Sequence, residues 1–224
     1  MLVIDAESHD ATVALARAHG ARTLVRPWGG FTATRLFALG EVWTAWTFML
    51  DADEVLDAPL RAALVAAQPD VSTDGYAVAR VTYFCGRPMR AGPWSRERPL
   101  RLFRTVRAAL SAHPAAGGAA DVHERWNVPG NVARLAGTLH HYSYPTLSAY
   151  REKFARYTSL EARSAEGSIR ALVQASALAC TRAGWWFFVR AGWRDGWRGA
   201  YVAVGSAFYP VVVAWKAWRA GPRS

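Results

Sequence analysis

Three carboxylates stand within four positions of the segment WTFMLDADEVLD (46–57), namely Asp51, Asp53 and Glu54. They directly follow an apolar run, which predicts a buried strand that delivers them to a loop. Carboxylates this close repel one another unless a cation lies among them, and in proteins that cation is usually a divalent metal. The segment therefore indicates either a metal-dependent site or, more simply, a strand end and helix start, where acidic residues are common.

One enzymatic interpretation is a phosphatase of the haloacid dehalogenase type, whose nucleophile motif, Asp-x-Asp-x-Thr/Val after a strand, is similar to DADEV (51–55). Such an enzyme also needs a lysine for the phosphoryl group and a later acidic pair for magnesium. The chain has two lysines, Lys153 and Lys216, both in sequence that predicts helix, and no later Asp-Asp pair. The sequence gives this interpretation little support.

A second enzymatic interpretation is a nucleotide-sugar glycosyltransferase. The leaving nucleoside diphosphate develops negative charge, and a divalent metal held by carboxylates neutralises it. Asp-x-Asp at a strand end holds that metal in one large class of these enzymes. The motif alone is weak because three residues recur by chance, so the choice depends on the surrounding elements.

The elements around the carboxylates alternate between strand and helix. Short apolar runs at 2–5 and 21–28 predict strands, and DATVALARAHG (10–20) and GGFTATRLFALGEV (29–42) predict helices. A further helix begins after the carboxylates, with Asp57 as its N-cap. This alternation predicts a parallel α/β sheet whose ligands lie at the carboxyl ends of the strands. Three aspartates stand at such ends: Asp5, Asp51 and Asp53.

The pattern changes after residue 73. Three apolar segments predict strands with less helix between them and indicate an antiparallel or mixed extension of the sheet: 74–86, 98–105 and 133–144. From Thr146 onward, apolar residues recur every three or four positions, which predicts helix. We therefore expect two domains, a core over 1–145 and a helical region over 146–224.

Charge is concentrated in the last part of the chain. Residues 167–224 carry eight basic residues and one acid, so they contribute +7 of the net charge of +10, together with six of the 11 tryptophans. Residues 199–215 are uncharged but contain Gly205, Ser206 and Pro210. A clean membrane span needs roughly 20 apolar residues, so this region is expected to lie along an anionic membrane surface rather than to cross it.

Other classes of protein have less support. The two cysteines, Cys85 and Cys180, provide neither a disulfide framework nor a zinc set and fit a reducing compartment. No signal peptide is visible. A nucleic-acid partner is not expected, because the basic tail lacks a recognised module and its tryptophans have apolar neighbours.

Several ordered motifs resemble family-two glycosyltransferases, and among them the subgroup that includes lipopolysaccharide core β-1,4-glucosyltransferases. The resemblance begins with the long segment 3–54, which contains PWGGF and LDADE. It continues in the same order with RLFR (101–104), VHE (122–124), HHYSY (140–144), YREKFARYT (150–158) and VRAGWRDGWRGAYVA (189–203). The resemblance therefore covers nearly the whole chain, and an ordered set of motifs is much more specific than one motif.

The resemblance implies the GT-A fold, a Rossmann-like mixed sheet flanked by helices, and an inverting transfer of a hexose, such as glucose, from a nucleotide-diphosphate sugar to a lipid-linked glycan. Uridine diphosphate (UDP) sugars are the expected donors, with Mn²⁺ or Mg²⁺ as the cofactor. Asp53 is the expected metal ligand. The residues expected to bind the nucleotide sugar are Asp5, Arg35, Asp51, Arg101 and Arg104. The expected location is cytoplasmic, at the inner face of the cell membrane.

Glu124 is the candidate catalytic base. Inverting transfer requires a base to take the proton of the acceptor hydroxyl, and His123 beside Glu124 could orient this carboxylate. A structural salt bridge of Glu124 with Arg125 or Arg104 is the alternative.

The chain also departs from the family pattern. A strand and helix that normally precede this segment and form part of the nucleotide pocket are absent from the sequence. Ser8, His9 and Asp10 replace the usual Ser-Thr-Asp, and Leu36 replaces an asparagine. The expectation is either a start codon called too late or a degenerate, non-catalytic protein that serves as a membrane-associated partner.

Overall fold

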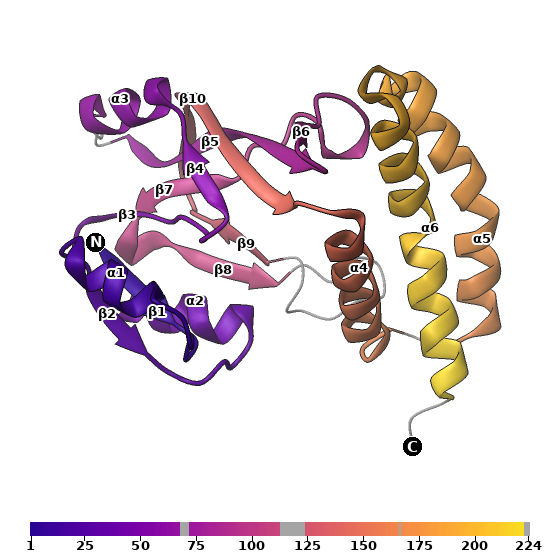
Figure 1. The fold of residues 1–224 in the computed structure, drawn as a ribbon, viewed down its shortest axis with the longest axis horizontal. Helices are drawn as coiled ribbons and strands as arrows, with labels where there is room; N and C mark the ends of the chain where they lie inside the picture. Colours follow the sequence, from indigo (N-terminus) through magenta and orange to yellow (C-terminus); the bar gives the residue numbers. More distant parts are fainter. Residues whose placement is uncertain (68–71, 113–123, 166, 222–224) are drawn as a thin grey trace.

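The computed structural model describes residues 1–67, 72–112, 124–165 and 167–221 (Figure 1). It is a mixed α/β structure with a central mixed sheet, flanking helices and a long C-terminal helix. The first two residues of the VHE motif, Val122 and His123, lie outside the described residues.

The N-terminal unit has the predicted strand–helix–strand–helix order. Its elements are β1 (Leu2–Asp5), α1 (Thr12–Ala18), β2 (Arg22–Val25) and α2 (Phe31–Gly40). β1 and β2 pair in parallel. The Asp10 carboxylate accepts a hydrogen bond from the backbone N–H of Thr12 at 3.0 Å, although the helix cap itself is Ala11. The expected strands and helices of this unit are therefore confirmed.

The predicted parallel sheet does not extend to the third strand. β3 (Trp46–Phe48) lies in the central sheet, where it runs antiparallel to β7 (Leu100–Arg104). Backbone hydrogen bonds continue this pairing on both sides of β3, from Thr105 to Ala45 and from Met49 to Arg101. The hydrogen-bonding edge of β3 is thus used by β7, and this part of the prediction was wrong.

The central sheet has the strand order β3-β7-β5-β10-β4, and β6 pairs with β5. Its remaining members are β4 (Glu54–Leu56), β5 (Thr73–Phe84), β6 (Arg87–Pro88) and β10 (Asn131–Tyr144). β5 and β10 run parallel, and the other pairs are antiparallel. A separate hairpin consists of β8 (Ala109–Ala112) and β9 (Glu124–Asn127). The expected mixed extension is therefore confirmed.

The acidic segment joins the two edges of this sheet. β3 and β4 are neighbours in sequence but stand at opposite ends of the strand order, so residues 49–53 pass from one edge to the other. The prediction of one continuous strand up to the carboxylates was too long, because β3 ends at Phe48 and β4 begins only at Glu54. As a consequence, residues of β7, β5 and β10 can all reach this connection.

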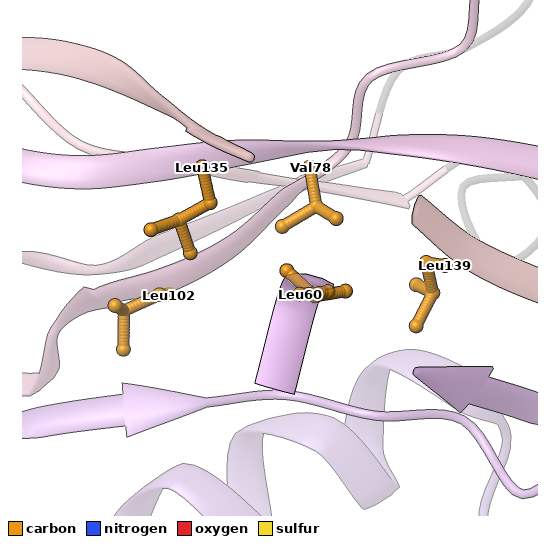
Figure 2. Packing of buried hydrophobic residues seen from close by; sticks show 5 residues of the cluster. All are labelled: Leu60, Val78, Leu102, Leu135 and Leu139. Carbon is orange, nitrogen blue, oxygen red and sulfur yellow. The ribbon is translucent and has the colours of Figure 1, made fainter. Parts of the chain in front are cut away.

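Helix α3 (Ala58–Ala66) covers one face of the sheet. The Asp57 side chain accepts a hydrogen bond from the backbone N–H of Leu60 at 2.8 Å, as predicted for an N-cap. Figure 2 shows the core formed beneath this helix. Its fully or nearly buried members are Leu60, Val78, Leu102, Leu135 and Leu139.

The C-terminal region is helical, as predicted. It contains α4 (Leu147–Ala162), α5 (Ile169–Gly184) and α6 (Gly196–Ala220), and the turn between α5 and α6 holds a π-helix, η3 (Trp185–Val189), and a 3₁₀ turn, η4 (Gly192–Asp195). The short turns elsewhere are η1 (Gly92–Trp94) and η2 (Thr105–Arg107). α6 packs against both α4 and α5 (Figure 1).

A second core joins these helices to the sheet. Phe84 of β5, Tyr150 of α4 and Val202 of α6 are buried together with Met89. Among the described residues, one helical segment, Gly192–Ala220, is long and apolar enough to cross a membrane, and a third of its most apolar window (33%) is buried against the rest of the protein.

Candidate functional site

The acidic connection is held in a fixed conformation by backbone hydrogen bonds. The N–H of Tyr142 in β10 donates to the carbonyl oxygen of Asp53 at 2.8 Å, and the N–H of Met49 donates to that of Arg101 in β7 at 2.8 Å. Within the connection, the N–H of Glu54 donates to the carbonyl oxygen of Asp51 at 3.0 Å. These bonds hold the connection that carries Asp51 and Asp53 against β7 and β10.

Arg101 lies between two of the carboxylates. Its Nη2 donates to Asp51 Oδ2 at 2.9 Å and also to Glu54 Oε1. The Glu54 side chain is fully buried, and its Oε1 also lies 3.3 Å from Arg80 Nη1 of β5. Because a buried carboxylate without a cation would be very costly, these two arginines account for the burial of Glu54.

Arg35 brings helix α2 to the same carboxylate. Its Nη2 donates to Asp51 Oδ1 at 3.0 Å, so the two oxygens of Asp51 each accept from a different arginine. This ion pair connects the N-terminal unit to the acidic connection. The Arg35 side chain keeps 21% of its surface exposed, whereas Arg101 keeps 5%.

Asp53 has different partners. Its Oδ2 lies 3.3 Å from His141 Nε2 of β10 and 3.8 Å from Lys153 Nζ of α4. Lys153 also donates to the carbonyl oxygen of Ser143 at 2.9 Å. With 39% of its side chain exposed, Asp53 is the more accessible of the two aspartates.

These contacts keep both aspartates ionised. Burial raises the pKa of Asp51, but the charges of Arg101 and Arg35 outweigh this effect, so the pKa lies below its ordinary value. For Asp53, the hydrogen bond from His141 is the largest cause, and together with Lys153 it lowers the pKa against burial and the nearby charge of Asp51. Each aspartate therefore remains a negatively charged group near neutral pH.

The structure does not gather every predicted site residue in this cluster. Asp5 is buried at the end of β1, where its Oδ1 accepts a hydrogen bond from the backbone N–H of Ser8 at 2.9 Å. Arg104 is directed to a different partner from Arg101, since its Nε lies 3.3 Å from Asp74 Oδ1. For Glu124, the backbone is described in β9, but the side chain is outside the described part.

The described residues contain no group of three or more His, Cys, Asp or Glu side chains that could enclose a metal. Mg²⁺ is commonly held by only one or two carboxylates, with phosphate and water completing its shell. Asp53, whose side chain is partly exposed, is the residue of the cluster that fits this simpler arrangement. His141 Nε2 donates to this carboxylate and is therefore not counted as a metal ligand.

Sequence reasoning missed three basic partners of the carboxylates: Arg80, His141 and Lys153. His141 stands directly opposite Glu54 in the β10–β4 register, and Lys153 belongs to a helix that follows β10. The basic types of these residues were visible in the sequence, but their meeting depends on the strand order, which the sequence pattern does not contain.

No family model matches the chain. It is 29% identical over 171 residues to lipopolysaccharide core biosynthesis glycosyltransferase LpsC of Rhizobium meliloti (strain 1021), an alignment that covers 72% of this chain and 60% of the relative. An uncharacterized glycosyltransferase of Rickettsia felis is 23% identical over 193 residues, covering 84% of this chain and 68% of the relative. Another from Rickettsia conorii is 38% identical over 61 residues, or 27% of this chain and 22% of the relative.

The chain thus spans less than two thirds of the length of the Rhizobium relative. Each of these similar proteins carries the name of a glycosyltransferase, and the alignments to the first two cover most of this chain. By these similarities, the chain is a distant homologue of glycosyltransferases.

Proposed function

We propose that this protein is a GT-A-type inverting glycosyltransferase of family two, which transfers a hexose such as glucose from a nucleotide-diphosphate sugar to a lipid-linked glycan such as a lipopolysaccharide core. The observation that carries the proposal is the meeting of Asp51 and Asp53 with basic side chains from four elements: Arg35, Arg101, His141 and Lys153. The name of the Rhizobium relative supports the class of acceptor.

The mixed charge of this cluster suits a UDP-sugar. A diphosphate needs cations, and guanidinium groups bind phosphate oxygens in a bidentate manner. Arg35 is partly exposed and could turn from Asp51 to the diphosphate. Arg101 is nearly buried, so its contribution is to hold Asp51 in place, and Asp5 at the end of β1 is proposed for the nucleoside side. Arg104 is proposed as a more distant contact.

Mn²⁺ or Mg²⁺ is the proposed cofactor, with Asp53 as its protein ligand. When bound, the metal would neutralise the negative charge that develops on the leaving diphosphate. Asp53 is suitable because it is ionised and partly exposed. His141 and Lys153 hold the carboxylate in position, and the positive charge of Lys153 competes with the metal for it.

Glu124 is the proposed base. Its role would be to accept the proton of the acceptor hydroxyl while the sugar carbon is attacked from the face opposite the leaving diphosphate. Glu124→Gln should therefore slow transfer by about 10²- to 10⁴-fold without weakening binding of the donor. A variant that transfers at the rate of the unchanged protein would show that another group is the base.

We propose a peripheral location on the inner face of the cell membrane. The polar contacts between α6 and α4 support lying along the surface rather than crossing it. Lys216 Nζ donates to Thr158 Oγ1 at 2.7 Å and to the carbonyl oxygen of Ala155 at 2.9 Å, and the Tyr209 hydroxyl donates to Glu161 at 2.6 Å. If α6 crossed the bilayer, α4 and its charges would have to accompany it at high cost.

Calorimetric titration with UDP, with and without Mn²⁺, tests the donor site. We expect saturable binding that requires the metal, and we expect Asp53→Asn to abolish it with little effect on folding. Asp195→Asn makes the same change at a distant position in η4 and should bind as the unchanged chain does. Equal binding by the Asp53 variant would refute the metal assignment.

A second candidate function is a degenerate glycosyltransferase that acts as a membrane-bound partner. The observation in its favour is that basic side chains of the protein itself already pair with Asp51 and Asp53. It predicts intact vesicle binding without UDP binding. The same titration, combined with vesicle flotation, separates the two functions.

A further inference from the structure

The outer helices expose an unusual amount of apolar surface. Half of the exposed large apolar residues in the described part of the chain lie between residues 169 and 218. On α6 these exposed positions are spaced by seven, four, seven and three residues, so they fall on one face of the helix: Trp197, Val204, Phe208, Trp215 and Trp218. In Figure 1, α5 and α6 form the edge of the molecule farthest from the N-terminal unit.

This surface contains a groove of about 260 Å³ between the end of α5, η3 and the first half of α6. All of its lining residues are apolar: Ala183, Gly184, Phe187, Phe188, Ala200, Ala203 and Val204. Such a lining provides no side-chain partner for sugar hydroxyls or phosphate, and binding a polar group without hydrogen bonds is costly. The groove therefore suits a narrow hydrocarbon chain.

Positive charge accompanies the groove in the sequence. Two arginines, Arg182 and Arg190, stand within two positions of lining residues. The nearby Arg198 is engaged elsewhere, since its Nη2 donates to the carbonyl oxygen of Cys85 at 3.1 Å. The acid of this region, Asp195, is already engaged, since its Oδ2 accepts hydrogen bonds from the backbone N–H groups of Arg90 at 3.0 Å and Ala91 at 2.9 Å. Arg182 and Arg190 are thus suited to an anionic headgroup.

We propose that this groove binds an acyl chain of an anionic bilayer phospholipid, with Arg182 and Arg190 facing the headgroup phosphate. The inference rests on the membrane association in the proposed function but not on sugar transfer. A second copy of the chain is a poorer occupant, because residues 167–224 carry +7 and two such surfaces would repel each other. An anionic lipid instead offers both an apolar chain and the opposite charge.

Gly184→Phe is a suitable variant for blocking the groove. Gly184 has an ordinary helical φ of −59°, and a Cβ atom added there would meet nothing within 4 Å. Gly40→Phe is the matched control, because a Cβ at the end of α2 also meets nothing within 4 Å and lies far from the groove in the fold. Both variants add the same apolar side chain, so a difference between their yields of lipid adducts reports on the groove alone.

The test is photo-crosslinking in vesicles of phosphatidylglycerol and phosphatidylcholine, in which the phosphatidylglycerol carries a diazirine on its acyl chain. Trypsin separates the groove into peptides 183–190 and 199–216, while peptide 171–182 reports on the remainder of α5. We expect adducts concentrated on the two groove peptides. Gly184→Phe should reduce them by about tenfold, the equivalent of roughly two buried methylenes, and Gly40→Phe should leave them unchanged.

Flotation of the same samples distinguishes the outcomes. If the chain floats with the vesicles but adducts form mainly on peptide 171–182, or are unaffected by Gly184→Phe, the groove inference is wrong while membrane association stands. If the chain does not float, both fail. A concentration-dependent dimer that Gly184→Phe disrupts, without lipid adducts, would assign the groove to a second copy and overturn the inference.

Discussion

At the scale of single residues, the acidic connection depends on Arg101, whose guanidinium lies between Asp51 and the fully buried Glu54. Arg101→Met should lower the free energy of unfolding by about 3 kcal/mol, because it leaves a buried carboxylate with Arg80 as its remaining cation. Urea denaturation measures the change.

The control is Arg22→Met, which removes an exposed ion pair with Glu41 and should lower the free energy of unfolding by less than about 1 kcal/mol. Equal losses in the two variants would contradict a structural role for Arg101.

Asp51 should also make stability depend on pH. Its folded-state pKa lies below the ordinary value because Arg101 and Arg35 outweigh the effect of burial. The ionised Asp51 therefore contributes fully to the free energy of unfolding above about pH 4. This contribution is lost as the pH falls through the folded-state pKa. Urea denaturation between about pH 3 and 6 should show a steeper acid loss for the unchanged protein than for Asp51→Asn. Parallel curves would mean that the two arginines do not stabilise the charged form.

At this scale, the sequence was informative about residue types but not about partners. Asp51, Asp53, Arg35 and Arg101 were predicted as site residues. The structure pairs both arginines with Asp51, while Asp53 has other partners. The contacts of Arg80 and His141 with the carboxylates were not predicted, because they arise only when 49–53 passes over β5 and β10. Residue types and their spacing along the chain indicate which chemistry is available. The strand order determines which of these residues become neighbours.

At the scale of elements, the packing of α3 on β10 depends on Gly137. This residue has a φ of +90°, and an added Cβ would lie 2.3 Å from the backbone nitrogen of Leu60. Gly137→Ala should therefore reduce the free energy of unfolding by about 3 kcal/mol or more, through backbone strain and a contact that cannot relax cheaply. Thermal and urea unfolding measure this change.

Gly86→Ala is the control for backbone strain alone. Gly86 has a similar φ of +76°, but an added Cβ meets nothing within 4 Å. It should cost about 1 to 2 kcal/mol, the penalty of the left-handed conformation for a residue with a side chain. If Gly137→Ala costs no more than this control, the close approach of α3 to β10 is not important for stability.

The local elements could be predicted from the sequence, but their pairing could not. Periodicity and capping residues such as Asp57 predicted α1, α2 and α3, and these helices are present. The prediction that β3 joins a parallel sheet failed because an apolar triplet does not reveal which neighbour it will pair with. β7 provided that neighbour from more than fifty residues later in the chain.

At the scale of the whole molecule, charge and apolar surface are gathered on the helices farthest from the N-terminal unit (Figure 1). The second core, with Phe84, Tyr150 and Val202, fixes these helices to the sheet. A membrane bound along α5 and α6 would therefore hold the acidic connection at a set distance from the surface. This arrangement suits an acceptor whose lipid remains in the bilayer.

The membrane proposal leads to a prediction about charge. Exchanging both Arg190 and Arg194 for Gln should weaken binding to phosphatidylglycerol vesicles by roughly 20- to 30-fold at low salt, since each basic residue near an anionic surface contributes about 1 kcal/mol. Flotation at several salt concentrations measures it. The effect should diminish toward 1 M salt, where the Debye length falls to about 3 Å.

The matched control exchanges Arg17 and Arg134, exposed residues of α1 and β10, and alters net charge by the same amount. If attraction came only from the overall charge of +10, both double variants would weaken binding equally. If α5, η4 and α6 form the bound surface, only the Arg190/Arg194 pair should have a large effect. The vesicle binding that the Arg190/Arg194 double variant retains at high salt would then measure the apolar part of the binding free energy. Exposed side chains such as Trp197 and Phe208 contribute this part.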